Sequence, residues 1–328
     1  MRILSYVKGL DGSSYHRVFM PNQTISDEVR VKNEINEDDL VWCDILHYSR
    51  HTRLSTKFLR EMRDKHQFKI VVDVDDWLEV HKDHPRYDYW RKSNVSLQIR
   101  DHLMTADAVI CTHDRLAKEV STLNQFVYVI PNGIDYGAGQ FKARKQKDSE
   151  RVRLLYASTI MNYSNTAIIA GAMKKIKHLP IEVVIAGHHE SPFFDILVNN
   201  LTAGREIPHR LMPWADSKTY MSKYEGDIGI LPSKPSKFNS MKSNLKVLEY
   251  AALKMPVVVS EAEPYLEMPV SYFNGENSFV EKITELVEDA ELRKASGEKL
   301  YKWCKENYSL KSMAENRMNI YKEVYDRG

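Results

Sequence analysis

The chain has 328 residues, of which 43% are hydrophobic and 28% are charged, and its formal net charge at pH 7 is +2. This balance predicts a folded globular protein and excludes a disordered chain, and the length allows two domains. A net charge so close to zero does not by itself indicate a nucleic-acid-binding protein.

Short apolar runs of strand type alternate with helical stretches in the first 135 residues. We expect strands at 2–7, 44–50, 68–76, 106–112 and 126–135, and helices at 52–66 and 93–106. This alternation is typical of a parallel sheet that is covered by helices, and the continuous apolar runs indicate strands buried on both faces.

The pattern stops after Asp135 and then starts again. Residues 136–152 contain glycines and many charges, which indicates a linker. Strands are then expected at 153–158, 181–187, 227–232 and 256–260, and helices at 164–179, 243–254 and 309–328. We therefore expect an α/β protein with two doubly wound domains, 1–135 and 153–305, and a final helical segment, 306–328, that returns to the first domain.

The sequence also indicates the cellular compartment in which the protein is found. The cysteines, Cys43, Cys111 and Cys304, lie far apart and form no motif with metal spacing. No run approaches the ~20 apolar residues of a membrane span, and residues 1–10 lack a signal-peptide core. We therefore expect reduced thiols in a soluble cytoplasmic protein without an integral membrane segment.

Three carboxylates, Asp73, Asp75 and Asp76, stand at the end of the strand expected at 68–76. Asp73 and Asp75 form the D-x-D pattern that holds a divalent cation in one class of sugar-transferring enzymes. The alternatives are an acceptor pocket that uses Asp75 and Asp76 without a metal, and a structural cap on the next turn. Asp73 lies within the strand pattern, which favours a structural role.

The helix expected at 243–254 begins with features that suit a phosphate. Ser243 is the expected N-cap, and a helix start presents unpaired N–H groups and a positive dipole end. Lys242 adds a full positive charge there, and Glu249 can accept hydrogen bonds from ribose hydroxyls. An ordinary amphipathic helix with solvated lysine and glutamate is the alternative.

Residues 242–260 resemble the donor-binding signature of retaining glycosyltransferase family 4, whose members have the GT-B fold. In many bacterial and phage-type members the segment is close to K-S-x-L-K-x-L-E-Y-A-A-L-G-x-P-V-V-x-S, and this chain has KSNLKVLEYAALKMPVVVS. It departs at Lys254, where the family prefers glycine. It also has Met241 in place of the first glutamate of the family's E-x7-E motif.

The resemblance implies a nucleotide-sugar donor, with a UDP-sugar favoured, bound in a cleft between two Rossmann-like domains. The donor-binding residues that it implies are Lys242, Ser243, Asn244, Leu245, Glu249, Ser158, Thr159, Asn162, Met212 and Trp214. The resemblance also implies a glycine loop near the reacting groups, with Gly9, Gly12 and Ser13. Arg17 follows this loop and is assigned to the same part of the site. Lys242 and the helix start would offset the diphosphate charge, so no metal or other cofactor is required.

His188 and His189 are candidate metal ligands, but no third ligand lies near them in the sequence.

The resemblance also places Asp75 and Asp76 on the acceptor side of the cleft, where Asp76 would orient the acceptor hydroxyl. Arg86, Tyr89, Trp90 and Arg91 follow, and such a mixture of aromatic and basic residues can stack bases and hold phosphates, although a half-buried surface cluster is the alternative.

Compact members of this kind occur among phage proteins, so we expect a hydroxymethylated pyrimidine in DNA as the acceptor, in a host cytoplasm if the chain is phage-encoded. A saccharide, free or lipid-linked, in surface-polymer synthesis is the alternative acceptor. The alternative function outside the enzymes is that of a catalytically silent GT-B protein that binds nucleotide sugars.

Overall fold

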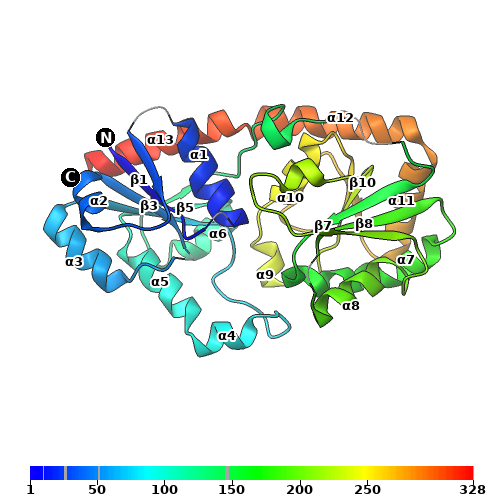
Figure 1. Ribbon diagram of the computed structural model, residues 1–328, viewed down its shortest axis with the longest axis horizontal. Helices are drawn as coiled ribbons and strands as arrows, with labels where there is room; N and C mark the ends of the chain where they lie inside the picture. Colours follow the sequence, from blue (N-terminus) through cyan, green and yellow to red (C-terminus); the bar gives the residue numbers. More distant parts are fainter. Residues whose placement is uncertain (10, 26–27, 51, 145–147, 189, 328) are drawn as a thin grey trace.

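A computed structural model describes residues 1–9, 11–25, 28–50, 52–144, 148–188 and 190–327. Within these ranges the chain forms two parallel sheets of six strands that lie side by side (Figure 1). The first sheet contains β1 (Ile3–Tyr6), β2 (Val29–Lys32), β3 (Ile45–Ser49), β4 (Lys69–Val74), β5 (Ala108–Cys111) and β6 (Val127–Val129). The second contains β7 (Val152–Ala157), β8 (Ile181–His188), β9 (His209–Pro213), β10 (Ile228–Leu231), β11 (Val257–Ser260) and β12 (Ser271–Phe273).

The strand order is β2-β1-β3-β4-β5-β6 in the first sheet and β12-β11-β10-β7-β8-β9 in the second. The helical segments of the N-terminal half are η1 (Ser14–Phe19, a π-helix), α1 (Met20–Thr24), α2 (Glu37–Trp42), α3 (Thr56–His66), α4 (Tyr87–Lys92), α5 (Val95–Thr105) and α6 (Asp114–Val120). Those of the C-terminal half are the 3-10 segments η2 (Gly139–Phe141), η3 (Ile160–Ile169) and η4 (Tyr220–Lys223) and the helices α7 (Ala170–Ile176), α8 (Pro192–Leu201), α9 (Lys237–Ser240), α10 (Leu245–Ala252), α11 (Glu276–Glu288), α12 (Ala290–Asn307) and α13 (Leu310–Asp326).

Both sheets are buried on both faces, as the apolar runs predicted. Ile45 and Leu46 are neighbours on β3, yet they belong to two different core clusters, because successive side chains of a strand point to opposite faces. Leu154 and Leu155 on β7 divide in the same way. The prediction of two doubly wound α/β domains is therefore confirmed.

The strands that the sequence did not reveal are β2, β9 and β12. Each lies at an edge of its sheet, where one side has no neighbouring strand. Their residues are largely only partly buried, so their sequences lack a continuous apolar run. The helix expected at 164–179 also differs, because the chain runs through the 3-10 segment η3 before α7 begins at Ala170.

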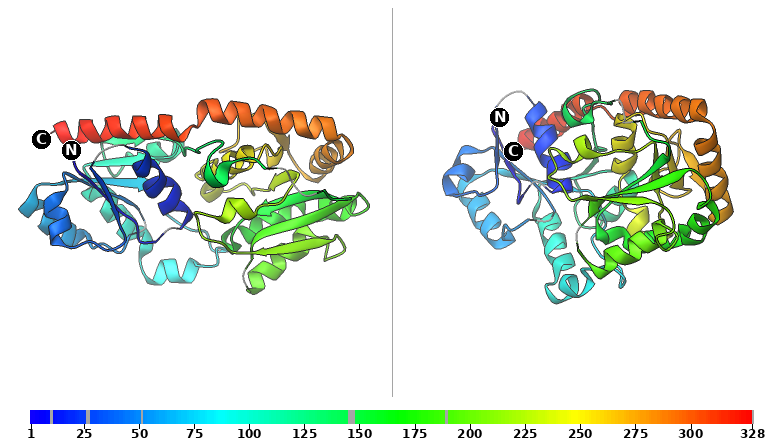
Figure 2. Two further views of the ribbon diagram at one scale, coloured as in Figure 1. Left: turned by 45° about the horizontal axis from the view of Figure 1, so that its top comes forward. Right: turned by 45° about the vertical axis from the view of Figure 1, so that its right-hand side comes forward.

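The two long C-terminal helices join the halves of the molecule. Figures 1 and 2 show α12 over the second sheet and α13 over the first, which brings the C-terminus next to the N-terminus. Ile320, Tyr321 and Val324 of α13 pack with Ile3 and Ile45 of the first sheet. This last helix therefore contacts the N-terminal half.

The turn after α10 has a backbone conformation that suits glycine, the residue that the family resembled by residues 242–260 prefers at position 254. Lys254 has a φ of 57°, in the left-handed region that disfavours residues with a side chain. Its carbonyl approaches Gly297 of α12 so closely that an added Cβ there would lie 2.0 Å from the oxygen. Lys254 donates to Glu298 at 2.8 Å, so the side chain that replaces glycine gains a partner on the same helix.

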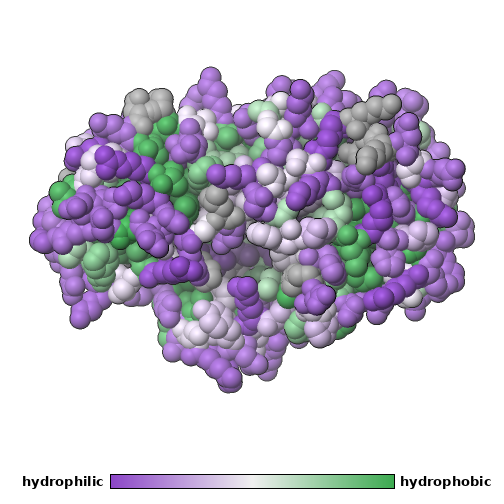
Figure 3. Space-filling view, viewed as in Figure 1, coloured by the Kyte–Doolittle hydropathy of each residue, from purple (hydrophilic) through white to green (hydrophobic). Residues whose placement is uncertain are grey.

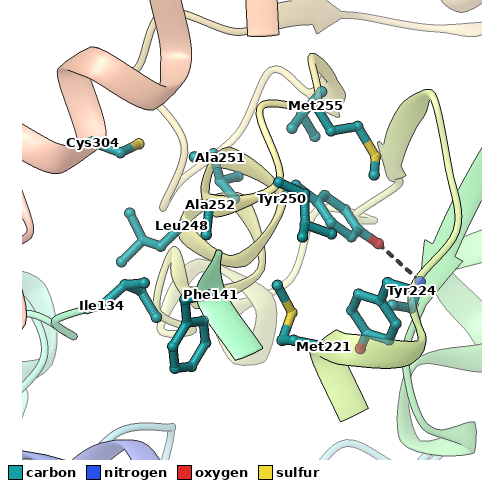
Figure 4. Close-up of a cluster of buried hydrophobic side chains, with 14 of the residues drawn as sticks. Ile134, Phe141, Met221, Tyr224, Leu248, Tyr250, Ala251, Ala252, Met255 and Cys304 are labelled. Carbon is teal, nitrogen blue, oxygen red and sulfur yellow. Dashed lines mark hydrogen bonds between the residues drawn. The ribbon is translucent and has the colours of Figure 1, made fainter. Parts of the chain in front are cut away.

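The segment predicted to be a linker is packed in part. Tyr136 and Phe141 are buried, and Figure 4 shows Phe141 and Ile134 beside Leu248 of α10. Gln140 donates to Tyr15 in the N-terminal half and to the Ser217 carbonyl in the C-terminal half. This part of the linker is therefore a contact between the two halves.

Candidate functional site

Two adjoining cavities lie where the carboxyl ends of the two sheets meet, and Figure 3 shows the surface hollowed between the halves. The larger has a volume of about 290 Å³ and the smaller about 210 Å³. The predicted site residues around the larger cavity are Gly12, Ser13, Asp75, Ser158, Thr159, Asn162, Met212, Trp214, Leu245 and Glu249. Those around the smaller cavity are Asp75, Asp76, Ser158, Asn162, Lys242, Ser243 and Leu245.

The start of α10 lies between the cavities. Lys242 contacts the Asn162 side chain, and burial lowers the pKa of its ammonium, an effect that Asp76 opposes. The prediction that Ser243 is the N-cap was wrong. Asn244 occupies that position with φ −83° and ψ 11°, and its side chain makes no capping bond. Asn244 faces another hollow, with His113 and Glu263, rather than either of the two cavities.

Lys246 was matched in the motif but not predicted as a site residue. It lines both cavities, and its side chain is 33% exposed. Its position as the second residue of α10 places a positive charge at the junction of the two cavities. The signal in the sequence was the second lysine of the K-S-x-L-K pattern.

Glu249 is buried more deeply than the sequence suggested, with 1% of its surface exposed. Its Oε1 accepts a hydrogen bond from the Tyr220 hydroxyl at 2.5 Å, and its Oε2 accepts one from Lys246 at 2.6 Å. His16 of the N-terminal half contacts the same hydroxyl, with 2.9 Å between Nε2 and the hydroxyl oxygen, and its Nε2 lies 3.7 Å from Glu249 Oε1. His16 and Tyr220 were not found from the sequence, because 204 residues separate them.

The outer end of the larger cavity is formed by β9 and the residues after it. Trp214 is 60% exposed there, and its backbone N–H donates to the His188 carbonyl at 3.1 Å. Gly187 has a φ of 98°, and a Cβ on it would lie 2.5 Å from the Ser158 carbonyl oxygen. Glycine at this position lets β8 end close against the Ser158 loop.

Asp75 and Asp76 form the wall that belongs to the N-terminal half. Ser13 donates to Asp75, which connects the glycine loop to the end of β4, and the Arg50 guanidinium lies 3.4 Å from the same carboxylate. Burial raises the pKa of Asp76, and Arg50 and Lys242 oppose that rise. The site thus holds two carboxylates against two cations before any ligand is present.

Asp73 takes no part in either cavity. It is fully buried, and its oxygens accept hydrogen bonds from Arg17 and Arg317. The expectation that Arg17 belongs to the glycine loop at the cavity is thereby corrected: its guanidinium lies beneath the loop and neutralises Asp73. Asp73 is therefore engaged elsewhere and does not form a chelating pair with Asp75.

Within the described ranges, no three or more His, Cys, Asp or Glu residues are grouped so that they could hold a metal ion. The ring of His188 packs edge-on against Phe194, with 4.6 Å between centroids. His189, the other histidine considered as a ligand, lies outside the described residues.

The residues predicted to contact the acceptor lie on or beside α4, outside the lining of both cavities. Trp90 and Arg91 border a separate hollow of about 330 Å³. The Trp90 indole donates to Ser96 and packs near His84, so this ring is held in the fold, whereas Tyr89 is 55% exposed. Arg86 is the residue before the first turn of α4.

Helix α9 is docked into the N-terminal half. Phe238 and Met241 are buried in the core cluster of the first sheet, and the carbonyls of Ser240 and Met241 contact Arg115 and His113. The Met241 side chain, at the position where the family that residues 242–260 resemble has a glutamate, therefore packs against the opposite half.

Comparison with known structures identifies the architecture. Sucrose-phosphate synthase from Thermosynechococcus elongatus superimposes with a TM-score of 0.71 at 11% identity, over 100% of both chains. The chain has the GT-B fold. HepE from Anabaena, solved with UDP-glucose, has a TM-score of 0.72 at 11% identity over 98% of this chain and 100% of its own. A trehalose-phosphate synthase from Burkholderia xenovorans has a TM-score of 0.63 at 14% identity over 88% of this chain and 75% of its own.

No family model matches the chain, and no curated protein matches its sequence. In the part of the chain that is described, there is no helix of the length and apolar character needed to cross a bilayer.

Proposed function

We propose that the chain is a glycosyltransferase that moves a sugar from a UDP-sugar to an acceptor hydroxyl. The observation that carries the proposal is the pair of adjoining cavities in a GT-B cleft with Lys246 at their junction. Their volumes together fall within the roughly 300–1,000 Å³ of small-molecule sites. The GT-B neighbours include a complex with UDP-glucose, a sucrose-phosphate synthase and a trehalose-phosphate synthase, which supports this class of reaction.

In this proposal the larger cavity takes the nucleoside diphosphate and the smaller takes the sugar. The base lies beside Met212 and Trp214, and Glu249 accepts from the ribose hydroxyls. Lys246 and Lys242 offset the diphosphate, and the start of α10 adds the positive end of the helix dipole. The sugar then lies between Lys242 and Asp76.

We assign the chain to the retaining family 4 on its K-S-x-L-K-x-L-E-Y-A-A-L segment. The leaving diphosphate is stabilised electrostatically, and the acceptor attacks from the same face of the sugar. Asp76 orients the acceptor hydroxyl, and the diphosphate oxygen takes its proton. No metal ion is needed, because the two lysines supply the charge that a cation would.

We propose a hydroxymethylated pyrimidine in DNA as the acceptor. Arg86, Arg91 and Lys92 surround the exposed Tyr89 on α4, and such a surface suits phosphates and a stacked base. A base within a duplex would have to be flipped to reach Asp76. The hydroxymethyl group supplies the nucleophile that unmodified DNA lacks in the major groove.

The test is transfer of labelled sugar from a panel of UDP-, GDP- and ADP-sugars to hydroxymethylcytosine DNA, hydroxymethyluracil DNA, plain DNA and a saccharide panel. Transfer to a modified DNA alone supports the full proposal. Transfer to a saccharide alone rejects the DNA acceptor and keeps the glycosyltransferase. Binding of a UDP-sugar in a thermal-shift assay, with neither transfer nor slow hydrolysis, would indicate a silent binding protein instead.

A further inference from the structure

The buried contact between His16, Tyr220 and Glu249 joins the two halves of the molecule at the proposed donor site. His16 lies on η1, directly after the glycine loop, whereas Tyr220 and Glu249 belong to the C-terminal half. His16 and Glu249 each expose 1% of their surface. A π-helix such as η1 is rare in proteins and is frequently found at functional sites.

The direction of the hydrogen bonds follows from the chemistry of the three groups. A carboxylate only accepts, so the Tyr220 hydroxyl donates its proton to Glu249 Oε1. The Tyr220 oxygen then accepts from His16, whose Nε2 must carry the proton. Burial lowers the pKa of His16 to about 4, an effect that Glu249 opposes, so the ring is neutral at pH 7.

This tautomer leaves Nδ1 of His16 as a buried acceptor, and it has no hydrogen-bond partner among the described residues. An unsatisfied buried polar atom is costly, and leucine at this position would avoid that cost. The hydrogen bond that histidine makes here and leucine could not is the one from Nε2–H to the hydroxyl that holds Glu249.

We propose that His16 and Tyr220 are positioning residues that hold the Glu249 carboxylate in the orientation that binds the donor nucleotide. This inference rests on the proposed function, in which Glu249 accepts from the ribose. An ionised carboxylate has about four acceptor positions, and Tyr220 and Lys246 occupy one on each oxygen. The remaining position on each oxygen is available to the ribose hydroxyls.

Without the Tyr220 hydrogen bond, the Glu249 carboxylate can turn fully toward Lys246. The two side chains then form an ion pair that draws both of them away from the nucleotide. Because His16 comes from the N-terminal half, the affinity for the nucleotide depends on contact between the halves. The dependence is reciprocal: bound nucleotide must stabilise that contact and with it η1.

The experiment measures UDP affinity by calorimetry for the full chain and four variants. Tyr220→Phe and His16→Leu should each weaken UDP binding about tenfold, in keeping with a hydrogen bond to a charged group. His16→Gln retains an N–H donor of similar reach and should recover most of the affinity. Tyr136→Phe is the matched control, because its hydroxyl contacts the Leu248 carbonyl of the same helix but not Glu249.

Thermal unfolding of each variant establishes that it is folded. Hydrogen exchange supplies a second readout: UDP should slow exchange of the amides of Ser14–Phe19 in the unmodified chain, and much less in Tyr220→Phe. Unchanged UDP affinity in folded Tyr220→Phe, or exchange in η1 that does not respond to UDP, would overturn the positioning role alone. Failure of the unmodified chain to bind UDP would overturn the proposed donor site as well.

Discussion

Arg317 and Asp73 form a buried ion pair between the C-terminal helix α13 and the first sheet, with 2.9 Å between Nη1 and Oδ2. Arg317 is on α13, and Asp73 is on β4, directly before the aspartates of the cleft. Arg17 binds the other oxygen of the same carboxylate at 2.6 Å. The C-terminal helix is therefore fixed to the strand that positions Asp75 and Asp76.

We expect Arg317→Met to lower the free energy of unfolding by about 1.5–3 kcal/mol, the range of a hydrogen bond to a charged group, because Asp73 loses the Arg317 contact and keeps Arg17 as its cation. Urea unfolding followed by circular dichroism measures the change. Lys311→Met on the same helix is the control, since its ion pair with Glu315 is exposed and spans 4.0 Å. A change in Arg317→Met no larger than in the control would contradict this account.

The pH dependence of stability should come from four buried histidines and Asp73. Burial lowers the pKa of His16, His47, His84 and His102 to about 4. Between that value and the ordinary histidine pKa of about 6.5, the unfolded chain therefore binds more protons than the folded chain. The free energy of unfolding should therefore fall between about pH 6.5 and 4, by up to ~1.4 kcal/mol per pH unit for each histidine.

Asp73 adds a second loss at lower pH. Burial alone would raise its pKa, but Arg17, Arg317 and His47 outweigh that effect and hold the pKa well below the ordinary 3.8. Its contribution is thus present above that ordinary value and declines as pH falls toward the folded-state pKa. Denaturant titrations from pH 7 to 3 check both windows. A stability that stays constant from pH 6.5 to 4 would rule out the neutral buried histidines.

Donor binding should depend on the charges at α10. Lys242→Ala should weaken binding of the UDP-sugar by about 1.5–3 kcal/mol, the range of a hydrogen bond to a charged group, and Glu249→Gln should weaken it too. Calorimetry with UDP-glucose measures both, and Lys237→Ala, an exposed lysine paired with Glu119, is the control. If both Lys242→Ala and Glu249→Gln bind as the unmodified chain does, the assignment of the donor site is wrong.

Turnover should survive removal of divalent metal. Lys242 and Lys246 border the cavities where the diphosphate would lie, and Asp73 is engaged by two arginines. Activity should be the same with EDTA as with Mg²⁺. Activity that disappears with EDTA and returns with Mg²⁺ or Mn²⁺ would restore a metal role for the aspartates at the end of β4.

If DNA is the acceptor, its binding should weaken as the salt concentration rises, because basic residues on and beside α4 neutralise its phosphates. Each phosphate neutralised adds about −0.9 to the slope of log affinity against log salt. Replacement of Arg86, Arg91 and Lys92 by alanine should flatten the slope while UDP affinity is retained.

The matched control for α4 is alanine at Lys294, Lys299 and Lys302, which are exposed on α12 and change the net charge equally. Figure 1 shows α12 and α4 on opposite sides of the molecule. Equal loss of slope in both triple variants would indicate nonspecific attraction and not a DNA surface on α4.

The sequence by itself determined the two α/β units and the strand ends at which the site lies. Buried parallel strands require continuous apolar runs, and these can be read without neighbours. Asp75 could be named because it follows such a strand, and Lys242 because it stands at the start of the helix expected at 243–254. Ser158 was named from the resemblance to the glycosyltransferase family. The edge strands β2, β9 and β12 could not, since an exposed strand needs no such run.

Only the tertiary structure decided which side chains meet. Asp73 and Asp75 look alike in the D-x-D pattern, yet one is neutralised by Arg17 and Arg317 and the other faces the cavities. His16, Tyr220 and Glu249 come together from both halves, and Met241 packs into the opposite core. The physical reason is that a local pattern records burial and turn chemistry, whereas these contacts join residues many tens of positions apart and exist only once the two sheets have docked.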